Sequence, residues 1–143
     1  DEFYRDGSLI RFAGNAGVAD AVFEDYAQVA HAFFNFGRRF ENEQAIRFAS
    51  ALTGRAQSLF LRNNRWQQKA QSLIPIAPGK WIIPDQVFIS PMTLWLTVAL
   101  EVPDLDSEVR ASATDMLQRA SRDMLDSPYF YGSFILLRSN SQG

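Results

Sequence analysis

The spacing of apolar residues changes near Lys80, and this change constrains the fold more than any other feature of the sequence. Before Lys80, apolar residues recur every three or four positions, as on one face of a helix. After Lys80, short runs of β-branched and aromatic residues are bounded by proline or alternate along the chain, as in strands. We therefore expect helices in the first half and mainly strands, with one helix, in the second.

Two long helices are predicted before Lys80. The first spans 18–36, and Gly37 is placed to end it in a left-handed conformation. The second spans 42–61 with Asn42 as its N-cap, and a short helix is expected over 65–73. The first apolar arc comprises Val18, Val22, Tyr26, Val29, Phe33 and Phe36, with Phe23, Ala27, Ala30 and Phe34 beside it. The second comprises Ala45, Phe48, Ala49, Leu52, Ala56, Leu59 and Phe60.

Four strands are predicted after Lys80, over 81–83, 86–89, 93–102 and 129–137. A helix is the alternative for 93–102, because Ser90-Pro91 followed by apolar residues is also a common helix start. The alternation of large side chains in this segment favours the strand. One further helix, capped by Asp104 or Asp106, is predicted to run to Asp126. Its apolar stripe comprises Val109, Ala113, Met116, Leu117, Ala120 and Met124.

The predicted order of elements indicates an α+β fold, because helices and strands are largely segregated along the chain. We expect N-terminal helices packed on a small antiparallel or mixed sheet, with one helix between the last two strands. The 143 residues fit a single domain, 1–143, that is large enough to bury a core. Because the chain begins at Asp1 without methionine, we expect a processed product or part of a longer protein.

The composition argues against several chemistries. The chain has no cysteine, which excludes a disulfide framework, a thiolate nucleophile and a cysteine metal site. The single histidine, His31, has no good metal ligand at helical spacing, so a solvated or hydrogen-bonded imidazole is expected. No motif for a nucleotide or other cofactor is present, and no apolar run reaches the roughly 20 residues of a membrane span. We predict a non-enzymatic protein without cofactor or metal.

Charge is sorted by segment. From Arg38 to Lys69 there are seven cations and two anions, whereas from Glu101 to Asp126 there are seven anions and three cations. On a continuous helix, four of these cations would share an arc of about 80° away from the apolar stripe, namely Arg47, Arg55, Arg62 and Arg65. The candidate interaction residues are Arg47, Arg55, Arg62, Arg65, Trp66 and Lys69.

The favoured hypothesis is a structural or protein-interaction subunit that docks a partner, or another copy of itself, through this charge-polarised surface. The alternative is that carboxylates of the last predicted helix form ion pairs with these arginines within the molecule and neutralise them. The second hypothesis is a nucleic-acid-binding module that uses the basic 47–69 face, with Trp66 stacking on bases. The overall pI near 5.3 weakens it. The third is a site for a small apolar ligand or an enzymatic pocket, lined by Phe33, Phe34, Phe36 and tryptophan residues, with Glu24 or Asp25 as a base.

Overall fold

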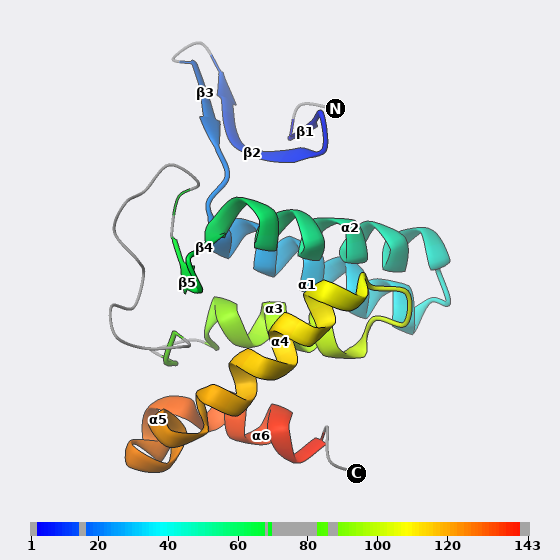
Figure 1. Cartoon of the computed structure of the whole chain (residues 1–143). Coiled ribbons are helices and arrows are strands. Elements are labelled where there is room, and N and C mark those ends of the chain that lie inside the picture. Colours follow the sequence, from blue (N-terminus) through cyan, green and yellow to red (C-terminus); the bar gives the residue numbers. More distant parts are fainter. Residues whose placement is uncertain (1–2, 15–16, 68, 70–82, 86–88, 141–143) are drawn as a thin grey trace.

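The computed structural model describes residues 3–14, 17–67, 69, 83–85 and 89–140, and these form two small sheets and a helical body (Figure 1). The strands are β1 (Tyr4–Arg5), β2 (Ser8–Gly14), β3 (Gly17–Asp20), β4 (Leu61–Arg62) and β5 (Arg65–Trp66). The helices are α1 (Phe23–Arg39), α2 (Glu43–Phe60), α3 (Pro91–Glu101), α4 (Ser107–Arg119), α5 (Ser121–Asp126), the 3-10 turn η1 (Pro128–Tyr131) and α6 (Gly132–Asn140).

The strands form two antiparallel sheets whose tight turns have left-handed residues. In the first sheet, β2 lies between β1 and β3, and Asp6 and Gly7 form the β1–β2 turn with φ of 51° and 76°. In the second, Asn63 and Asn64 join β4 to β5 with φ of 50° and 59°. Positive φ at both central residues is the geometry that lets a two-residue turn match the twist of a hairpin.

Helices α1 and α2 form an antiparallel pair, and α1 differs from the predicted helix at both ends. It begins after Val22 because residues 17–20 pair with β2, and Asp25 Oδ2 accepts the Val22 amide at 2.9 Å. It continues past Gly37, so the predicted left-handed end at that residue is wrong. Its buried face comprises the flanking set of the predicted arc together with Tyr26, whereas Phe33 and Phe36 are 40% and 48% exposed.

The second predicted helix is confirmed as α2, with Asn42 as the N-cap: the Asn42 side chain accepts the Ala45 amide at 3.0 Å. The prediction of further helix from Arg65 is wrong for Arg65 and Trp66, which form β5. The rest of that predicted helix lies almost wholly outside the described residues.

The segment predicted as a strand over 93–102 is instead the helix α3. Ser90 caps it by accepting the Met92 amide at 3.2 Å, and Pro91 occupies its first turn. The alternation was misleading because α3 packs against α1, α2, α4 and α6 and is therefore buried on most of its circumference. Its buried residues, Met92, Thr93, Trp95, Leu96, Val98 and Ala99, come from both faces of the predicted strand.

The remaining C-terminal segment is also helical. Asp106 caps α4 by accepting the amides of Glu108 and Val109, and the predicted apolar stripe is buried along α4 and α5. The predicted strand over 129–137 is wrong, because these residues form η1 and most of α6. The predicted strands over 81–83 and 86–89 lie mostly outside the described residues.

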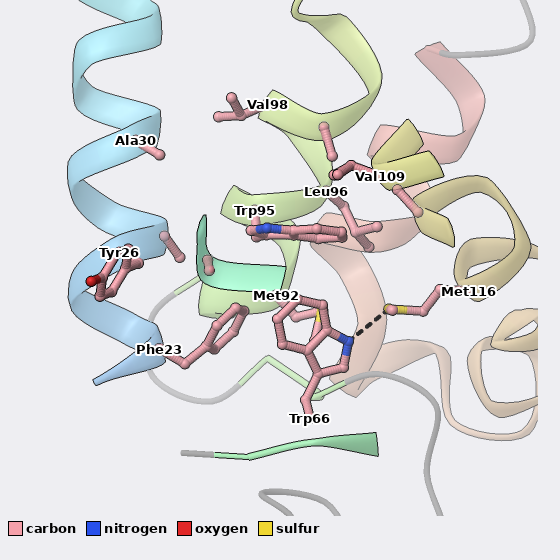
Figure 2. Close-up of a cluster of buried hydrophobic side chains, with 14 of the residues drawn as sticks. Phe23, Tyr26, Ala30, Trp66, Met92, Trp95, Leu96, Val98, Val109 and Met116 are labelled. Carbon is pink, nitrogen blue, oxygen red and sulfur yellow. Dashed lines mark hydrogen bonds between the residues drawn. The ribbon is translucent and has the colours of Figure 1, made fainter. Parts of the chain in front are cut away.

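The core joins all the helical elements, and its centre contains two tryptophans (Figure 2). Trp66 packs against Phe23 and Trp95, with ring centroids 4.5 and 4.7 Å apart, and its Nε1 donates to Met116 Sδ at 3.1 Å. Trp95 Nε1 donates to the Thr53 carbonyl of α2 at 3.0 Å. The short β4–β5 hairpin is therefore anchored to three helices through Trp66 and its neighbours.

The α+β class is confirmed in its general form, as helices with small antiparallel sheets. The predicted helix between the last two strands is wrong, because the described residues after Trp66 contribute helices and no strand element. The N-terminal helices pack chiefly on each other and on α3. Within the described ranges, no helix has the length and apolar character needed to cross a bilayer.

Candidate interaction surface

The β4–β5 hairpin presents two arginines side by side at its tip. Arg62 and Arg65 are a directly opposed pair across the two strands, and both side chains are exposed. The intervening Asn63 and Asn64 hold the left-handed turn, a conformation that asparagine adopts more readily than most residues. We call Arg62–Arg65 the basic hairpin.

Neither arginine of the basic hairpin forms an ion pair with a carboxylate in the described part of the chain. Directly opposed like charges destabilise a strand pair. The hairpin therefore has an exposed positive charge that no described carboxylate compensates and that its own folding does not favour.

Trp66, the residue that follows Arg65, is directed away from this surface. It is 5% exposed and packs in the core of Figure 2. Its ring could stack on a base only by leaving the core. The base-stacking role that the sequence suggested for Trp66 therefore has no exposed aromatic surface in this structure.

The other candidate cations do not form one helical face with the basic hairpin, because α2 ends at Phe60. Arg47 pairs with Glu43 on the same helix at 3.2 Å, and both side chains are largely exposed. Arg55 donates to Ser8 Oγ from Nε at 3.3 Å and from Nη2 at 3.0 Å, which ties α2 to the β1–β2 hairpin. Lys69 is exposed beyond β5.

The exposed acidic residues Asp104, Asp106 and Glu108 lie at the turn between α3 and α4, which we call the acidic turn. Figure 1 shows this turn and the basic hairpin at opposite ends of the helical body. One described ion pair links the basic and acidic segments, Arg38 with Glu101 at 2.6 Å. The described arginines of α2 and of the basic hairpin therefore form no ion pair with the acidic segment, although Arg47 pairs with Glu43 of its own helix.

His31 lies half-buried on α1 beside Asn35, whose Nδ2 is 3.2 and 3.3 Å from the two ring nitrogens. Burial lowers the pKa of the His31 imidazole from its usual value of 6.5, and the charge of Glu101 opposes that shift. Across the described residues, no three His, Cys, Asp or Glu side chains group as ligands for a metal ion.

The carboxylates named as alternative bases have structural partners. Glu24 accepts from Gln28 at 3.1 Å, and Asp25 accepts the Val22 amide and lies 3.6 Å from Arg11. The aromatic residues proposed to line a pocket with them do not converge: Phe34 is buried, whereas Phe33 packs edge-on to Phe48 at the surface.

A polar cluster that the sequence did not reveal joins three segments. Asp85 Oδ1 accepts from Ser133 Oγ at 2.5 Å and from the Ser90 amide at 3.0 Å, while Oδ2 accepts the Ser133 amide at 2.9 Å. Thr93 Oγ1 lies 2.7 Å from Ser133 Oγ. No imidazole or amine takes part in these contacts. The cluster fixes the start of α6 to α3 and to the segment before it, and no sequence spacing connects its members.

Comparison with known proteins gives no functional assignment: no family model, curated protein or solved structure matches the chain.

Proposed function

We propose that the chain is a non-enzymatic protein-interaction subunit that binds an acidic segment of a partner protein through the basic hairpin. The observation that carries this proposal is the opposed pair Arg62 and Arg65, exposed and without a carboxylate partner in the described structure. An unfavourable feature on a well-anchored surface element is explained if binding, and not folding, uses it. Guanidinium groups form bidentate hydrogen bonds with carboxylates, so Asp and Glu side chains are suitable ligands.

An acidic protein segment is favoured over nucleic acid. Single-stranded nucleic acid is held by stacking on exposed aromatic rings as well as by cations. The two aromatic residues that flank the basic hairpin in the sequence, Phe60 and Trp66, are both buried, and no large apolar side chain among the described residues 41–69 is strongly exposed. The basic hairpin thus offers a nucleic acid electrostatic attraction but no exposed ring on which a base could stack.

The acidic turn of another copy is one segment that meets this description. A contact between opposite ends of successive copies is heterologous and would build a ring or a filament. Such an assembly, like any contact formed by exposed opposite charges, weakens as salt is added.

The proposal is tested by measuring how the chain binds a short fluorescent poly-glutamate peptide by anisotropy at several salt concentrations. We expect binding that falls with salt and is lost in the double variant Arg62→Ser/Arg65→Ser. The matched control is Arg47→Ser, which removes another exposed arginine of the basic segment and should retain binding.

Two results would overturn the proposal: binding by the double variant equal to that of the wild type, or no salt-dependent binding at all. Tighter binding of a single-stranded RNA of matched charge would favour the nucleic-acid alternative. Self-assembly at low salt that is absent in the double variant would identify another copy as the acidic partner.

A further inference from the structure

The C-terminal helices carry an exposed apolar surface that the basic hairpin does not involve. Five of its side chains are large and strongly exposed: Leu125 (82%), Tyr129 (90%), Phe130 (54%), Ile135 (41%) and Leu136 (66%). We call these residues of α5, η1 and α6 the C-terminal apolar face. If a side chain of this size exposes about 200 Å² when free, the five together expose roughly 650 Å². The largest single apolar patch of a typical monomer is about 300–600 Å². Within the present total, Leu125 and Ile135 line one groove, and the ring centroids of Tyr129 and Phe130 lie 5.4 Å apart.

This face has a hollow beside its protruding side chains. A groove of about 480 Å³ lies between α5 and α6, with Met124, Leu125 and Pro128 on one side and Ile135 on the other. At the same groove, Arg138 donates a hydrogen bond to Ser121 Oγ and so connects the two helices. Tyr129, the most exposed of the apolar residues, follows the groove residue Pro128 in the chain.

The charges bordering Leu125 are balanced and opposite. Arg122 and Asp126 are both exposed on α5, one turn apart. The i,i+4 ion pair that their spacing permits is not formed in the described structure. Around Leu125 the exposed cation and the exposed anion balance, so this part of the surface offers no net charge to attract a strongly charged partner. Such a surface is complementary to the same surface of a second copy that is rotated by 180° about a two-fold axis.

We infer that a second copy of this chain docks on the C-terminal apolar face by two-fold symmetry. An isologous interface requires a protrusion and a hollow within the same patch, and Tyr129 and the α5–α6 groove supply both. The apolar area approaches the roughly 800 Å² that each partner contributes to a stable interface. In this pairing, Arg122 of each copy meets Asp126 of the other. The contact is independent of the basic hairpin, which remains free to bind its acidic partner.

The test is sedimentation equilibrium of the wild-type chain from low-micromolar to submillimolar concentration, at low and high salt. We expect a monomer–dimer equilibrium that persists at high salt, because burial of apolar surface drives it. Leu125→Glu and Tyr129→Glu should each weaken the dimer at least about tenfold. Both side chains are so exposed that folding, checked by circular dichroism, should be unchanged. The control Phe40→Glu alters a 65% exposed aromatic residue outside the face and should leave the dimer intact.

Exchanging the charges at positions 122 and 126 distinguishes a second copy of the chain from any other molecule bound at this face. Arg122→Asp should weaken the dimer by bringing aspartates together, and adding Asp126→Arg should restore it. Failure of the second change to restore the dimer would overturn the two-fold pairing. The inference is also overturned by a wild-type monomer at every concentration, by a dimer that both glutamate variants retain, or by a monomer that native mass spectrometry finds carrying a small apolar molecule. A dimer that Arg62→Ser/Arg65→Ser abolishes would place the contact at the basic hairpin instead.

Discussion

Arg65 lies where the requirements of folding and of binding conflict. It faces Arg62 across the hairpin, whereas an acidic residue at either position would form a favourable cross-strand pair. The strands are short, and Trp66 fixes their register by its packing against Phe23 and Trp95. The hairpin can therefore keep an unfavourable pair at its tip without losing its structure.

Arg65→Glu is expected to increase the free energy of unfolding by about 0.2–1 kcal/mol, because it replaces repulsion with attraction across the strands. The same change should abolish binding of the poly-glutamate peptide. Urea denaturation at low salt measures the first effect and anisotropy the second. The comparison variant Arg47→Glu loses the exposed pair with Glu43 and should be slightly less stable than the wild type. A loss of stability in Arg65→Glu would contradict the repulsion between Arg62 and Arg65 across the hairpin.

His31 should make stability depend on pH. Burial lowers its pKa below 6.5 in the folded protein, so on acidification the unfolded chain takes up the proton first. The stabilising contribution of neutral His31 is complete above pH 6.5 and is lost as pH falls through the lowered folded-state pKa. His31→Gln should remove this part of the decline between about pH 7.5 and 5.5. Urea denaturation across this interval measures it.

Glu101 provides the check on that assignment. Its charge raises the pKa of His31, so Glu101→Gln should lower that pKa further and steepen the loss of stability below pH 6.5. The accompanying loss of the Arg38–Glu101 ion pair shifts stability by a similar amount at each pH of the interval and leaves the slope unchanged. Identical slopes in wild type and His31→Gln would show that His31 does not control the decline.

At the scale of single elements, two glycines inside neighbouring helices have opposite roles. A Cβ at Gly37 of α1 would lie 2.6 Å from Ile46 Cγ1 and 3.0 Å from the Asn42 carbonyl oxygen. A Cβ at Gly54 of α2 would have nothing within 4 Å. The first glycine permits the close approach of α1 and α2, and the second only weakens its helix.

Gly37→Ala should therefore destabilise the protein by about 1–3 kcal/mol, as expected for overpacking against a rigid neighbour. Gly54→Ala should stabilise it by up to about 1 kcal/mol, because alanine restricts the unfolded chain and favours the helix. Both are measured by urea denaturation, and each serves as the control for the other. Equal effects of the two substitutions would contradict the packing described for the α1–α2 turn.

The elements that the sequence predicted well are those whose signals are local. Asn42 and Asp106 cap α2 and α4 as expected, and the apolar stripe of 109–124 is buried. The β1–β2 hairpin also has a local signal, Asp6-Gly7, which is typical of a two-residue turn and was not used. By contrast, α3 is surrounded by other helices, so its sequence has no polar face by which a helix could be recognised.

At the scale of the whole molecule, the separation of charge was predictable and the position of the candidate site was only partly so. Within the basic segment, the exposed Arg62 and Arg65 of the basic hairpin lie far from the acidic turn (Figure 1), whereas Arg38 pairs with Glu101 at the end of α3. The burial of Trp66 depends on Met116, fifty positions away, and no local pattern encodes that contact. Leu125 and Leu136 resemble core residues in sequence, and only the packing of α5 and α6 leaves them exposed.

The Asp85 cluster couples the C-terminal helices to the rest of the molecule, because Asp85 accepts hydrogen bonds from Ser90 before α3 and from Ser133 in α6. Asp85→Ala leaves these donors without their carboxylate and should cost roughly 1.5–3 kcal/mol. The loss should be concentrated in α6, because the Asp85 amide and carboxylate both contact the 130–133 segment whereas α1 is held by its own apolar core.

Amide hydrogen exchange measures this coupling directly. In Asp85→Ala, protection of α6 should fall while that of α1 is retained, since local opening of α6 no longer breaks charge-assisted hydrogen bonds. Asp104→Ala, which removes an exposed aspartate of the acidic turn outside the C-terminal apolar face, should change neither helix. Unchanged protection of α6 in Asp85→Ala would show that apolar packing of Phe134 and Leu137 alone holds this helix in place. Because α6 contributes Ile135 and Leu136 to the C-terminal apolar face, the same variant should also dimerise more weakly than Asp104→Ala.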